Sequence, residues 1–339
     1  MNKMIALIQY FSGTGNSLHA AHLIGEELKQ SGYEIIFHAI ENGLYNRIQQ
    51  FNLHLFFFPI YATSVPHIMC KYINRLQSGN GAKAAIISTN GRINTRFRDG
   101  YQGWALLQAR LLLRLKKYDV FFSDTLDYPH NITAFFPPRS VENNQKIIDM
   151  IAPKIHSISV KLINHQRYHR RFFIPNIIWS LPLGYLYSLI GRRIIGKLYI
   201  ADSHCINCGI CINQCPAKAI KTEHGQIQWN WKCEGCMRCI NICPQKAIQV
   251  SFLRLLALIP AAFFNPLFKV YRLIPGSFFQ NIGSVGKIAF KVMIDVVLFF
   301  LFFAIIDSIL CFLSRIPFFK SITDFSITKF YKRYYLKNK

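Results

Sequence analysis

The sequence predicts an α/β domain built on a five-stranded parallel sheet, followed by a small α+β metal-binding domain and a helical apolar tail. Apolar runs of strand length alternate with helical patterns over residues 1–163 of the 339-residue chain. A twelve-residue cysteine motif then occurs twice within residues 201–250. Residues 251–339 are richly apolar and basic, and residues 164–200 connect the first two domains.

Five strands and four helices are expected in the first domain. The strands are Met4–Tyr10, Glu34–Ile40, Leu53–Pro59, Lys83–Ser88 and Asp119–Ser123. The helices are Leu18–Gln30, Pro66–Leu76, Gly103–Lys116 and Ser140–Ile163. Because strands that alternate with helices pair in parallel, the first 163 residues are interpreted as one parallel α/β domain.

The loop after the first strand has the composition of an anion site. It reads Ser12-Gly13-Thr14-Gly15-Asn16-Ser17 and leads directly into the first helix. Glycines let backbone N–H groups converge on a phosphate, hydroxyls add donors, and the helix N-terminus supplies a positive dipole. The loop is neither G-x4-G-K-[ST] nor G-x-G-x-x-G, which counts against nucleoside triphosphates and dinucleotides.

With its Ser/Thr-x-Thr-Gly-x-Ser/Thr loop, the N-terminal part resembles the flavodoxin family. The resemblance implies a bound FMN, strand order 2-1-3-4-5 and a ligand at the carboxyl ends of the strands beside the switch point. It also implies that Tyr61 stacks on the flavin ring and that Thr89-Asn90-Gly91 meets the other side. The implied cofactor-binding residues are Ser12, Gly13, Thr14, Gly15, Asn16, Ser17, Tyr61, Asn90 and Gly91.

The second flavin loop departs from the family pattern. Flavodoxins commonly place acidic and aromatic residues there, whereas this chain has Arg92, Arg96 and Arg98. Tyr101 and Trp104 are the candidates for covering the other flavin face. A domain that has lost its FMN and serves as a scaffold is the alternative interpretation.

The two cysteine motifs have iron–sulfur spacing. Each is C-x2-C-x2-C-x3-C-P, beginning at Cys205 and again 28 residues later at Cys233. Three cysteines at two-residue gaps wrap one cube, while the fourth, followed by proline, ligates the neighbouring cube. The predicted ligand sets therefore cross: Cys205, Cys208, Cys211 and Cys243 for the first 4Fe-4S cluster, and Cys233, Cys236, Cys239 and Cys215 for the second.

Over residues 200–250 the sequence resembles the bacterial two-cluster ferredoxins. Ala219 to Trp229, with a turn at His224-Gly225, is expected to form a short hairpin that covers the clusters. Structural zinc usually uses two separated C-x2-C pairs, and a disulfide framework belongs to a secreted chain, so both alternatives fit this spacing poorly.

Thiolates in this number imply a reducing compartment, and the chain opens on a strand pattern without a signal peptide, so a cytoplasmic location is expected. The remaining cysteines, Cys70 and Cys311, lie in apolar runs and are expected to be buried, inert thiols.

The formal charge of +24 is unevenly distributed. Residues 151–200 carry eight basic and no acidic side chains, and residues 251–339 carry twelve and three. Within the connector, Phe172 to Gly191 is uncharged but contains Pro175, Pro182 and Gly184, which argue against one clean helix. It is expected either to lie in a membrane interface or to form an apolar strap between the two domains.

The tail is the most apolar part of the chain. Its prolines predict a broken helix over Ser251 to Pro275, and Val292 to Ser314 is the most hydrophobic window. Asp295 and Asp307 lie within that window, so an interfacial, re-entrant or protein-paired helix is expected in preference to a simple span. The basic, aromatic end from Lys329 to Lys339 favours anionic lipid. Nucleic acid is not expected as a partner, because no nucleic-acid-binding motif accompanies the basic residues.

Together the two domains resemble prokaryotic fusions of a flavodoxin-like domain with a two-cluster ferredoxin. The resemblance implies an electron-transfer protein that joins one-electron and two-electron redox partners, here at the cytoplasmic membrane face. Two alternatives stay open, and the sequence does not decide between carrier and enzyme. One is a flavin-dependent oxidoreductase acting on a small or lipid-like substrate, for which no catalytic residue is identified. The other is a ferredoxin with a non-flavin scaffold domain.

Overall fold

A computed structural model describes residues 4–45, 51–92, 102–172, 174–268 and 283–336. Its largest unit is a six-stranded parallel sheet, with the strand order β2-β1-β3-β4-β5-β6. The strands are β1 (Met4–Tyr10), β2 (Tyr33–Ala39), β3 (Leu53–Pro59), β4 (Lys83–Arg92), β5 (Asp119–Pro129) and β6 (Tyr168–His169). The predicted order 2-1-3-4-5 is therefore confirmed, and the domain has the flavodoxin-like fold.

Strands β4 and β5 continue well beyond the predicted Lys83–Ser88 and Asp119–Ser123. Their pairing runs as far as Arg92 and Pro129, through polar residues that a hydrophobic pattern does not reveal. The two-residue strand β6, from the basic part of the connector, was not predicted, and it extends the edge of the sheet beside β5.

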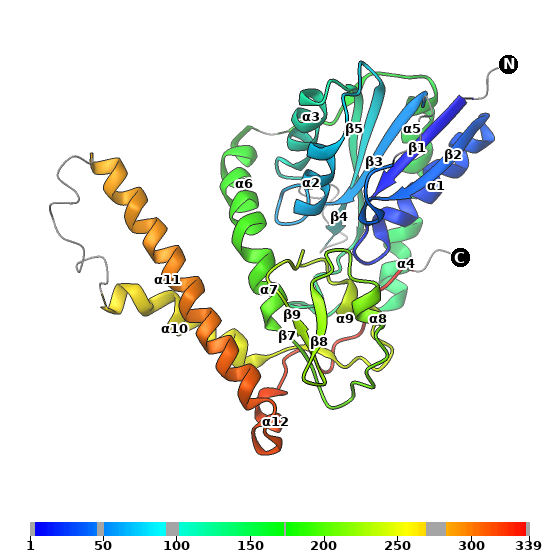
Figure 1. The fold of residues 1–339 in the computed structure, drawn as a ribbon. Helices are drawn as coiled ribbons and strands as arrows, with labels where there is room; N and C mark the ends of the chain where they lie inside the picture. The colour runs from blue at the N-terminus through cyan, green and yellow to red at the C-terminus, as the bar shows by residue number, and fades with distance from the viewer. Residues whose placement is uncertain (1–3, 46–50, 93–101, 173, 269–282, 337–339) are drawn as a thin grey trace.

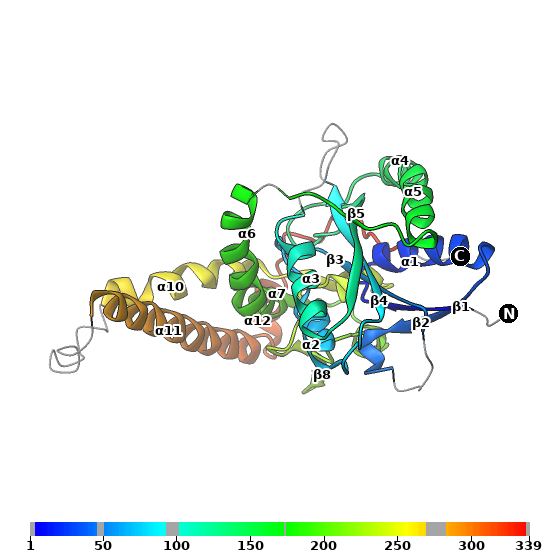
Figure 2. The ribbon, with the colours of Figure 1, turned by 90° about the horizontal axis from the view of Figure 1, so that it is seen from above.

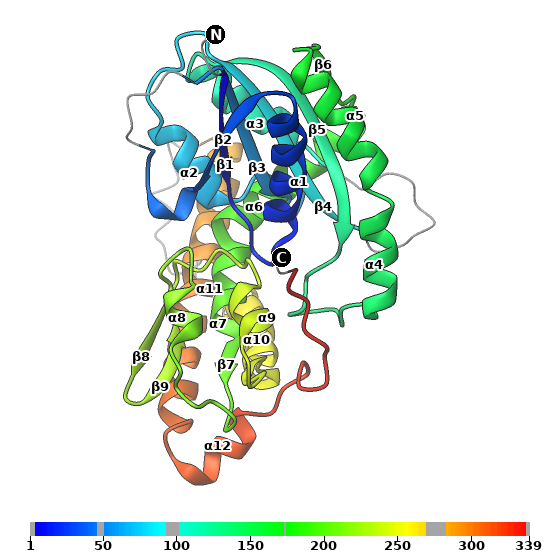
Figure 3. The ribbon, with the colours of Figure 1, turned by 90° about the vertical axis from the view of Figure 1, so that its right-hand side faces the viewer.

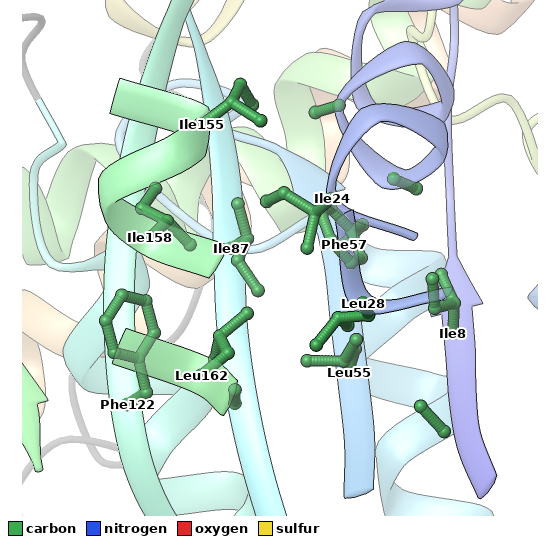
Figure 4. Close-up of a cluster of buried hydrophobic side chains, with 14 of the residues drawn as sticks. Ile8, Ile24, Leu28, Leu55, Phe57, Ile87, Phe122, Ile155, Ile158 and Leu162 are labelled. Atoms are coloured by element: carbon green, nitrogen blue, oxygen red, sulfur yellow. The ribbon is translucent and has the colours of Figure 1, made fainter. Parts of the chain in front are cut away.

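Helices cover both faces of the sheet (Figures 1 and 2). The first domain contains α1 (Asn16–Gln30), the short 3-10 helix η1 (Ile40–Asn42), α2 (His67–Arg75), α3 (Ala105–Leu115), α4 (Val141–Asp149) and α5 (Ala152–Ile163). Apolar side chains of α1 and α5 pack on one face, as Figure 4 shows, and those of α2 and α3 pack on the other. The predicted helix Ser140–Ile163 is divided into α4 and α5, with a proline in the first turn of α5.

The connector forms a helical strap. It consists of α6 (Ile174–Leu186), the π-helical turn η2 (Tyr187–Gly191) and α7 (Arg192–Leu198). The expectation was that the prolines and Gly184 argue against one clean helix; the segment is divided by the π-helical turn η2, although Pro182 itself lies inside α6. On its inner side Gly184 lies against Ser64 and Trp104, while on its outer side Trp179 is 78% exposed. The segment is thus packed on one face and apolar and exposed on the other.

The cysteine-rich domain is small, and its strands and helices are short. It contains β7 (Tyr199–Ala201), α8 (Ile210–Asn213), β8 (Ile220–Glu223), β9 (Gln226–Trp229), α9 (Arg238–Ile242) and β10 (Ile248–Val250). The predicted hairpin is present as β8 and β9, and its turn residues His224 and Gly225 have positive φ angles of 48° and 73°. The antiparallel pair of β7 and β10 joins the two ends of the domain.

The tail forms three helices that leave the body of the molecule on one side (Figures 1 and 2). They are α10 (Phe252–Phe268), α11 (Ser284–Leu313) and α12 (Pro317–Thr323). The prediction of a broken helix from Ser251 is wrong up to Phe268, because α10 continues through Pro260; residues 269–275 lie outside the described residues.

The end of α11 docks onto the rest of the protein through an ion-pair cluster. Asp307 is 5% exposed; its carboxylate lies 2.8 Å from the Lys197 ammonium and 3.4 Å from the Arg254 guanidinium. Buried charges are tolerated when they are paired in this way. Asp307 is therefore paired with other residues of the protein, which is one of the arrangements predicted for this helix.

Candidate metal centres

Two cavities in the cysteine-rich domain separate the eight motif cysteines into two groups of four. The first cavity has a volume of about 20 Å³. It is lined by three cysteines of the first motif and the last cysteine of the second motif: Cys205, Cys208, Cys211 and Cys243. The second also has a volume of about 20 Å³ and has the reciprocal lining: Cys233, Cys236, Cys239 and Cys215. Each cavity therefore combines the cysteines of the crossed ligand sets.

The local backbone aims the cysteines inward. In each motif a left-handed residue, Gly209 (φ 73°) or Met237 (φ 60°), precedes the one-turn helix α8 or α9. This turn bends the chain around the cavity so that cysteines at two-residue spacing share one centre. The proline after the fourth cysteine belongs to the wall of the opposite cavity, as Pro216 does in the second one.

The chemistry of these thiols fits a metal cluster. Burial, followed by the charges of Cys205, Cys243 and Cys208, raises the pKa of Cys211 to about 11. Burial likewise raises the pKa of Cys236 to about 12. Such groups become thiolates only when a cation compensates their charge, which iron supplies.

A single-ion site fits less well than a cluster. Among the residues that the structure describes, no three His, Cys, Asp or Glu side chains converge closely enough to hold one metal ion. A tetrahedral zinc needs its sulfur ligands about 2.3 Å from one centre. Four thiols that line one cavity match the four-cysteine ligand set of a 4Fe-4S cluster.

The two cavities differ in their surroundings. Cys208 of the first is exposed, and its neighbour Ile206 is 62% exposed. In the second, Cys233, Cys236 and Cys239 are all at most 9% exposed. The first cavity therefore lies at the surface, whereas the second is enclosed.

The second cavity is enclosed because the cysteine-rich domain sits on the carboxyl edge of the parallel sheet (Figure 3). Buried Arg238 holds the two domains together: its guanidinium donates to the Ser12 carbonyl (2.6 Å), to the Glu41 carboxylate (2.6 Å) and to the Gln214 carbonyl (2.9 Å). Burial opposes its charge, but the pKa of Arg238 is nevertheless raised because Glu41 faces it. The edge that binds ligands in flavodoxin-like folds is here a domain interface.

The predicted phosphate loop lies inside this interface. Ser12, Thr14, Asn16 and Ser17 are each at most 6% exposed. A Cβ added to Gly13 would overlap the carbonyl oxygen of Cys236, so the loop and the second cysteine motif are in direct backbone contact. Only glycine permits this approach.

The C-terminal segment covers the other end of the loop. The Leu336 amide donates to the Thr14 carbonyl (2.9 Å), and the Tyr334 hydroxyl donates to the Asn16 side-chain oxygen (2.6 Å). The Leu336 carbonyl lies so close to Gly15, whose φ is +98°, that an added Cβ would overlap it. In this arrangement an FMN phosphate does not fit against the loop, because protein occupies its approach.

The other flavin candidates are also turned toward protein. The Tyr61 ring packs edge-on against Phe11, and its hydroxyl is buried near Gly13 without a hydrogen-bond partner. Trp104 lies under α6, beside Gly184, and its ring nitrogen is buried and unpartnered. Tyr101, Arg96 and Arg98 lie outside the described residues.

Asn90 and Gly91 belong to the extended end of β4, close to the loop. Next to them, the Thr89 hydroxyl lies 2.7 Å from the Ser17 hydroxyl, while Gly91 backs onto His130. Their position is thus near the predicted flavin site, and their binding role stays a prediction.

Sequence reasoning missed the residues that join the domains. Arg238 and Glu234 occupy variable positions of the second cysteine motif, and Tyr334 belongs to no motif. Each acquires its role only from a partner distant in sequence, such as Glu41, Arg192 or Asn16. A buried charge with a fixed partner is invisible in a hydrophobic pattern.

The cysteine-rich segment matches a known family. Residues 197–244 match the family model of the 4Fe-4S dicluster domain. No curated protein sequence matches the chain. The chain therefore combines a flavodoxin-like domain with a 4Fe-4S dicluster domain and an apolar C-terminal helix, a combination that suggests electron transfer.

Several solved structures are similar to the first domain. A flavodoxin from the domain Archaea is 14% identical, with 45% of this chain and 99% of that chain covered and a TM-score of 0.31. The flavodoxin of Megasphaera elsdenii is 17% identical, with 35% and 84% covered and a TM-score of 0.28. An azoreductase from Bacillus anthracis is 9% identical, with 47% and 96% covered and a TM-score of 0.30.

The crossed ligand sets predict which cluster a given cysteine supports. Cys215→Ala is expected to damage the cluster held by Cys233, Cys236 and Cys239, although Cys215 belongs to the first motif, because its thiol lines the second cavity. EPR of the anaerobically purified, reduced variant measures which signal is lost. The reciprocal variant Cys243→Ala serves as the control and should affect the first cluster; loss of the first cluster alone in Cys215→Ala contradicts the crossed sets.

Proposed function

We propose that this protein is an electron carrier that binds two 4Fe-4S clusters through crossed cysteine sets and works at the cytoplasmic face of a membrane. The observation that carries the proposal is the pair of cavities, each lined by three cysteines of one motif and the fourth of the other. Bound clusters supply one-electron transfer. The protein's own part is to hold them, shield them and present them to redox partners.

One partner site is proposed at the first cavity. There Cys208 is exposed, and Ile206 and Ile210 beside it are 62% and 39% exposed. Exposed apolar side chains around a redox centre suit transient docking, which needs a small contact and close approach.

A second partner site is proposed at a basic hollow beside the second cavity. The hollow lies between α2 and the loops after Cys215 and Cys233, and it shares Pro216, Ala217 and Glu234 with the second cavity. Its cationic side chains are Lys71, Arg75, Arg192, Arg193, Lys218 and Lys232.

The hollow carries a positive excess. Its carboxylates are already paired: Glu234 lies 3.4 Å from Arg192, and Glu41 accepts from Arg238. Burial and the nearby Arg192 and Arg193 lower the pKa of His67 to about 4, so this histidine is neutral at neutral pH. The remaining cations attract acidic partners and steer them toward the second cluster.

The membrane location is supported by α11. This helix is 30 residues long and is the one helix of the described residues long and apolar enough to cross a bilayer. At helical rise it extends about 45 Å, compared with a hydrocarbon core of about 30 Å. Val297 and Leu301 on its surface are 58% and 57% exposed, and the exposed apolar face of α6 lies on the same side of the molecule (Figure 1).

A flavin-dependent reaction at Tyr61 finds no support in the described residues. The Tyr61 hydroxyl faces the dicluster domain near Gly13, where a substrate has no access. The flavodoxin-like domain is therefore proposed to act first as the platform on which the clusters are held. FMN is proposed only as a competitor of the C-terminal segment for the Ser12–Ser17 loop.

Anaerobic purification tests the proposed function directly. The full-length protein is expected to contain about eight iron atoms with matching sulfide and to give 4Fe-4S EPR signals after reduction, because two sets of four thiolates are available. Iron analysis and EPR measure this. Protein that is folded, prepared without air and still free of iron and sulfide would refute the proposal.

Reversing charge in the basic hollow is expected to slow electron exchange with an acidic partner. For Lys71→Glu/Lys232→Glu, the second-order rate constant with a reduced, acidic soluble ferredoxin should fall about tenfold at low salt, and the difference should shrink at high salt. Stopped-flow absorbance measures the rate. Lys29→Glu/Lys83→Glu, at exposed positions on α1 and at the start of β4, is the control of equal charge change. Equal rates for the two variants contradict docking at the hollow.

Charging the exposed face of α11 is expected to release the protein from membranes. Val297→Lys/Leu301→Lys places cations where hydrocarbon contact is proposed, at a cost of about 2.5–3.5 kcal/mol each at the bilayer centre. Fractionation measures the distribution, and Leu115→Lys, at a 79% exposed position on α3, is the control. An unchanged membrane fraction in the double variant argues against the anchor. Deleting the whole tail is a poorer test, because Phe303 and Thr328 are buried.

A further inference from the structure

We infer that the Ser12–Ser17 loop is a binding site for the chain's own C-terminal segment, Arg333–Leu336, and that FMN competes with this segment for the loop. The flavodoxin-like fold implies a flavin phosphate at this place, whereas the structure has peptide there. The loop has the composition of an anion site, but the backbone of the C-terminal segment lies against it in place of a phosphate.

The Leu336 backbone contacts the loop directly at two of its residues, Thr14 and Gly15. Leu336 lies along the loop with its amide bonded to the Thr14 carbonyl at 2.9 Å and its own carbonyl against Gly15. Gly15 precedes the first turn of α1, where the helix dipole favours negatively charged atoms. The Leu336 carbonyl therefore brings a partial negative charge close to the start of this helix.

The residues that directly precede this contact are anchored to the rest of the protein. The Tyr334 hydroxyl donates to Asn16 at 2.6 Å, its amide donates to Asn241 at 2.8 Å, and the residue is 7% exposed. The Arg333 guanidinium donates to the Lys246 and Ile248 carbonyls at 3.1 and 3.0 Å. The Leu336 side chain packs against the core beneath α1.

Contacts with the dicluster domain direct the tail toward the loop. Buried Thr328 accepts from the Val250 amide and donates to the Gln249 side chain, each at 2.8–2.9 Å. Figure 3 shows the segment after α12 rising beside the dicluster domain toward the start of α1. The last described residues therefore run toward the loop along the dicluster domain, to which they are hydrogen-bonded.

The C-terminal segment and a flavin phosphate compete because both would occupy the same space beside the loop. Ser12, Thr14, Asn16 and Ser17 are at most 6% exposed. The Cys236 backbone covers the loop at Gly13, and Leu336 covers it at Thr14 and Gly15, so a phosphate reaches the Thr14–Gly15 end only after Leu336 leaves. Tail docking is intramolecular and needs no ligand concentration, which gives it an advantage over a free cofactor. The docked protein is accordingly a flavin-free dicluster protein, and release of the tail opens the Thr14–Gly15 end of the loop.

The test is FMN binding to the full-length, iron-loaded protein under anaerobic conditions. Tyr334→Phe/Leu336→Pro removes the hydroxyl bond to Asn16 and the amide bond to Thr14, because proline has no N–H. Quenching of FMN fluorescence measures the dissociation constant. The double variant is expected to bind FMN at least tenfold more tightly than the parent protein, and riboflavin, which lacks the phosphate, should bind it at least tenfold more weakly than FMN does.

A matched control and a second measurement complete the test. Phe330→Ala changes a 90% exposed residue of the same segment and should bind FMN as the parent does. Trypsin should cleave after Arg333 at least tenfold faster in the double variant than in the parent. Equal FMN affinity of parent and double variant, absence of FMN binding to both, or equal cleavage would overturn the inference. Iron content, measured on every sample, reports separately on the proposed function.

Discussion

The arrangement of the whole molecule depends on one buried guanidinium. Arg238, in the second cysteine motif, binds the Ser12 carbonyl of the predicted phosphate loop, the Glu41 carboxylate after β2 and the Gln214 carbonyl of the first motif. Burying an arginine costs free energy unless its N–H groups are hydrogen-bonded, so the three partners have to be in place together. This single residue therefore joins the sheet edge to both cysteine motifs and gives the two domains one defined orientation.

That orientation decides what the flavodoxin-like domain can do. Parallel sheets of this type bind ligands at the carboxyl ends of their strands. Here the same edge is covered by the Cys236 backbone above Gly13 and by Leu336 beside Gly15, so the sheet presents its ligand-binding edge to other parts of the same chain. The domain contributes rigidity and enclosure to the second cluster site, while the first remains near solvent.

The tail has two physical roles that meet at the dicluster domain. At one end Asp307 of α11 is neutralised by Lys197 and Arg254, which fastens an apolar helix to the domain. At the other end the chain returns along Gln249 and Val250 to the phosphate loop. The dicluster domain therefore lies between an element suited to lipid and an element that closes the predicted flavin site.

By itself the sequence determined the elements whose signals are local. Cysteine spacing led to the two predicted ligand sets, alternating apolar runs to the parallel sheet, and His224-Gly225 to the hairpin turn, because metal ligation, hydrophobic periodicity and turn geometry act over a few residues. The strand order followed from the resemblance of the Ser12–Ser17 loop to that of flavodoxins. The tertiary structure alone decided the rest: the longer β4 and β5, the division between α4 and α5, the helix through Pro182, and the occupation of the Ser12–Ser17 loop by the C-terminal segment. These depend on contacts between residues far apart in the chain, such as Tyr334 with Asn16, and no local pattern encodes which distant surface a segment will meet.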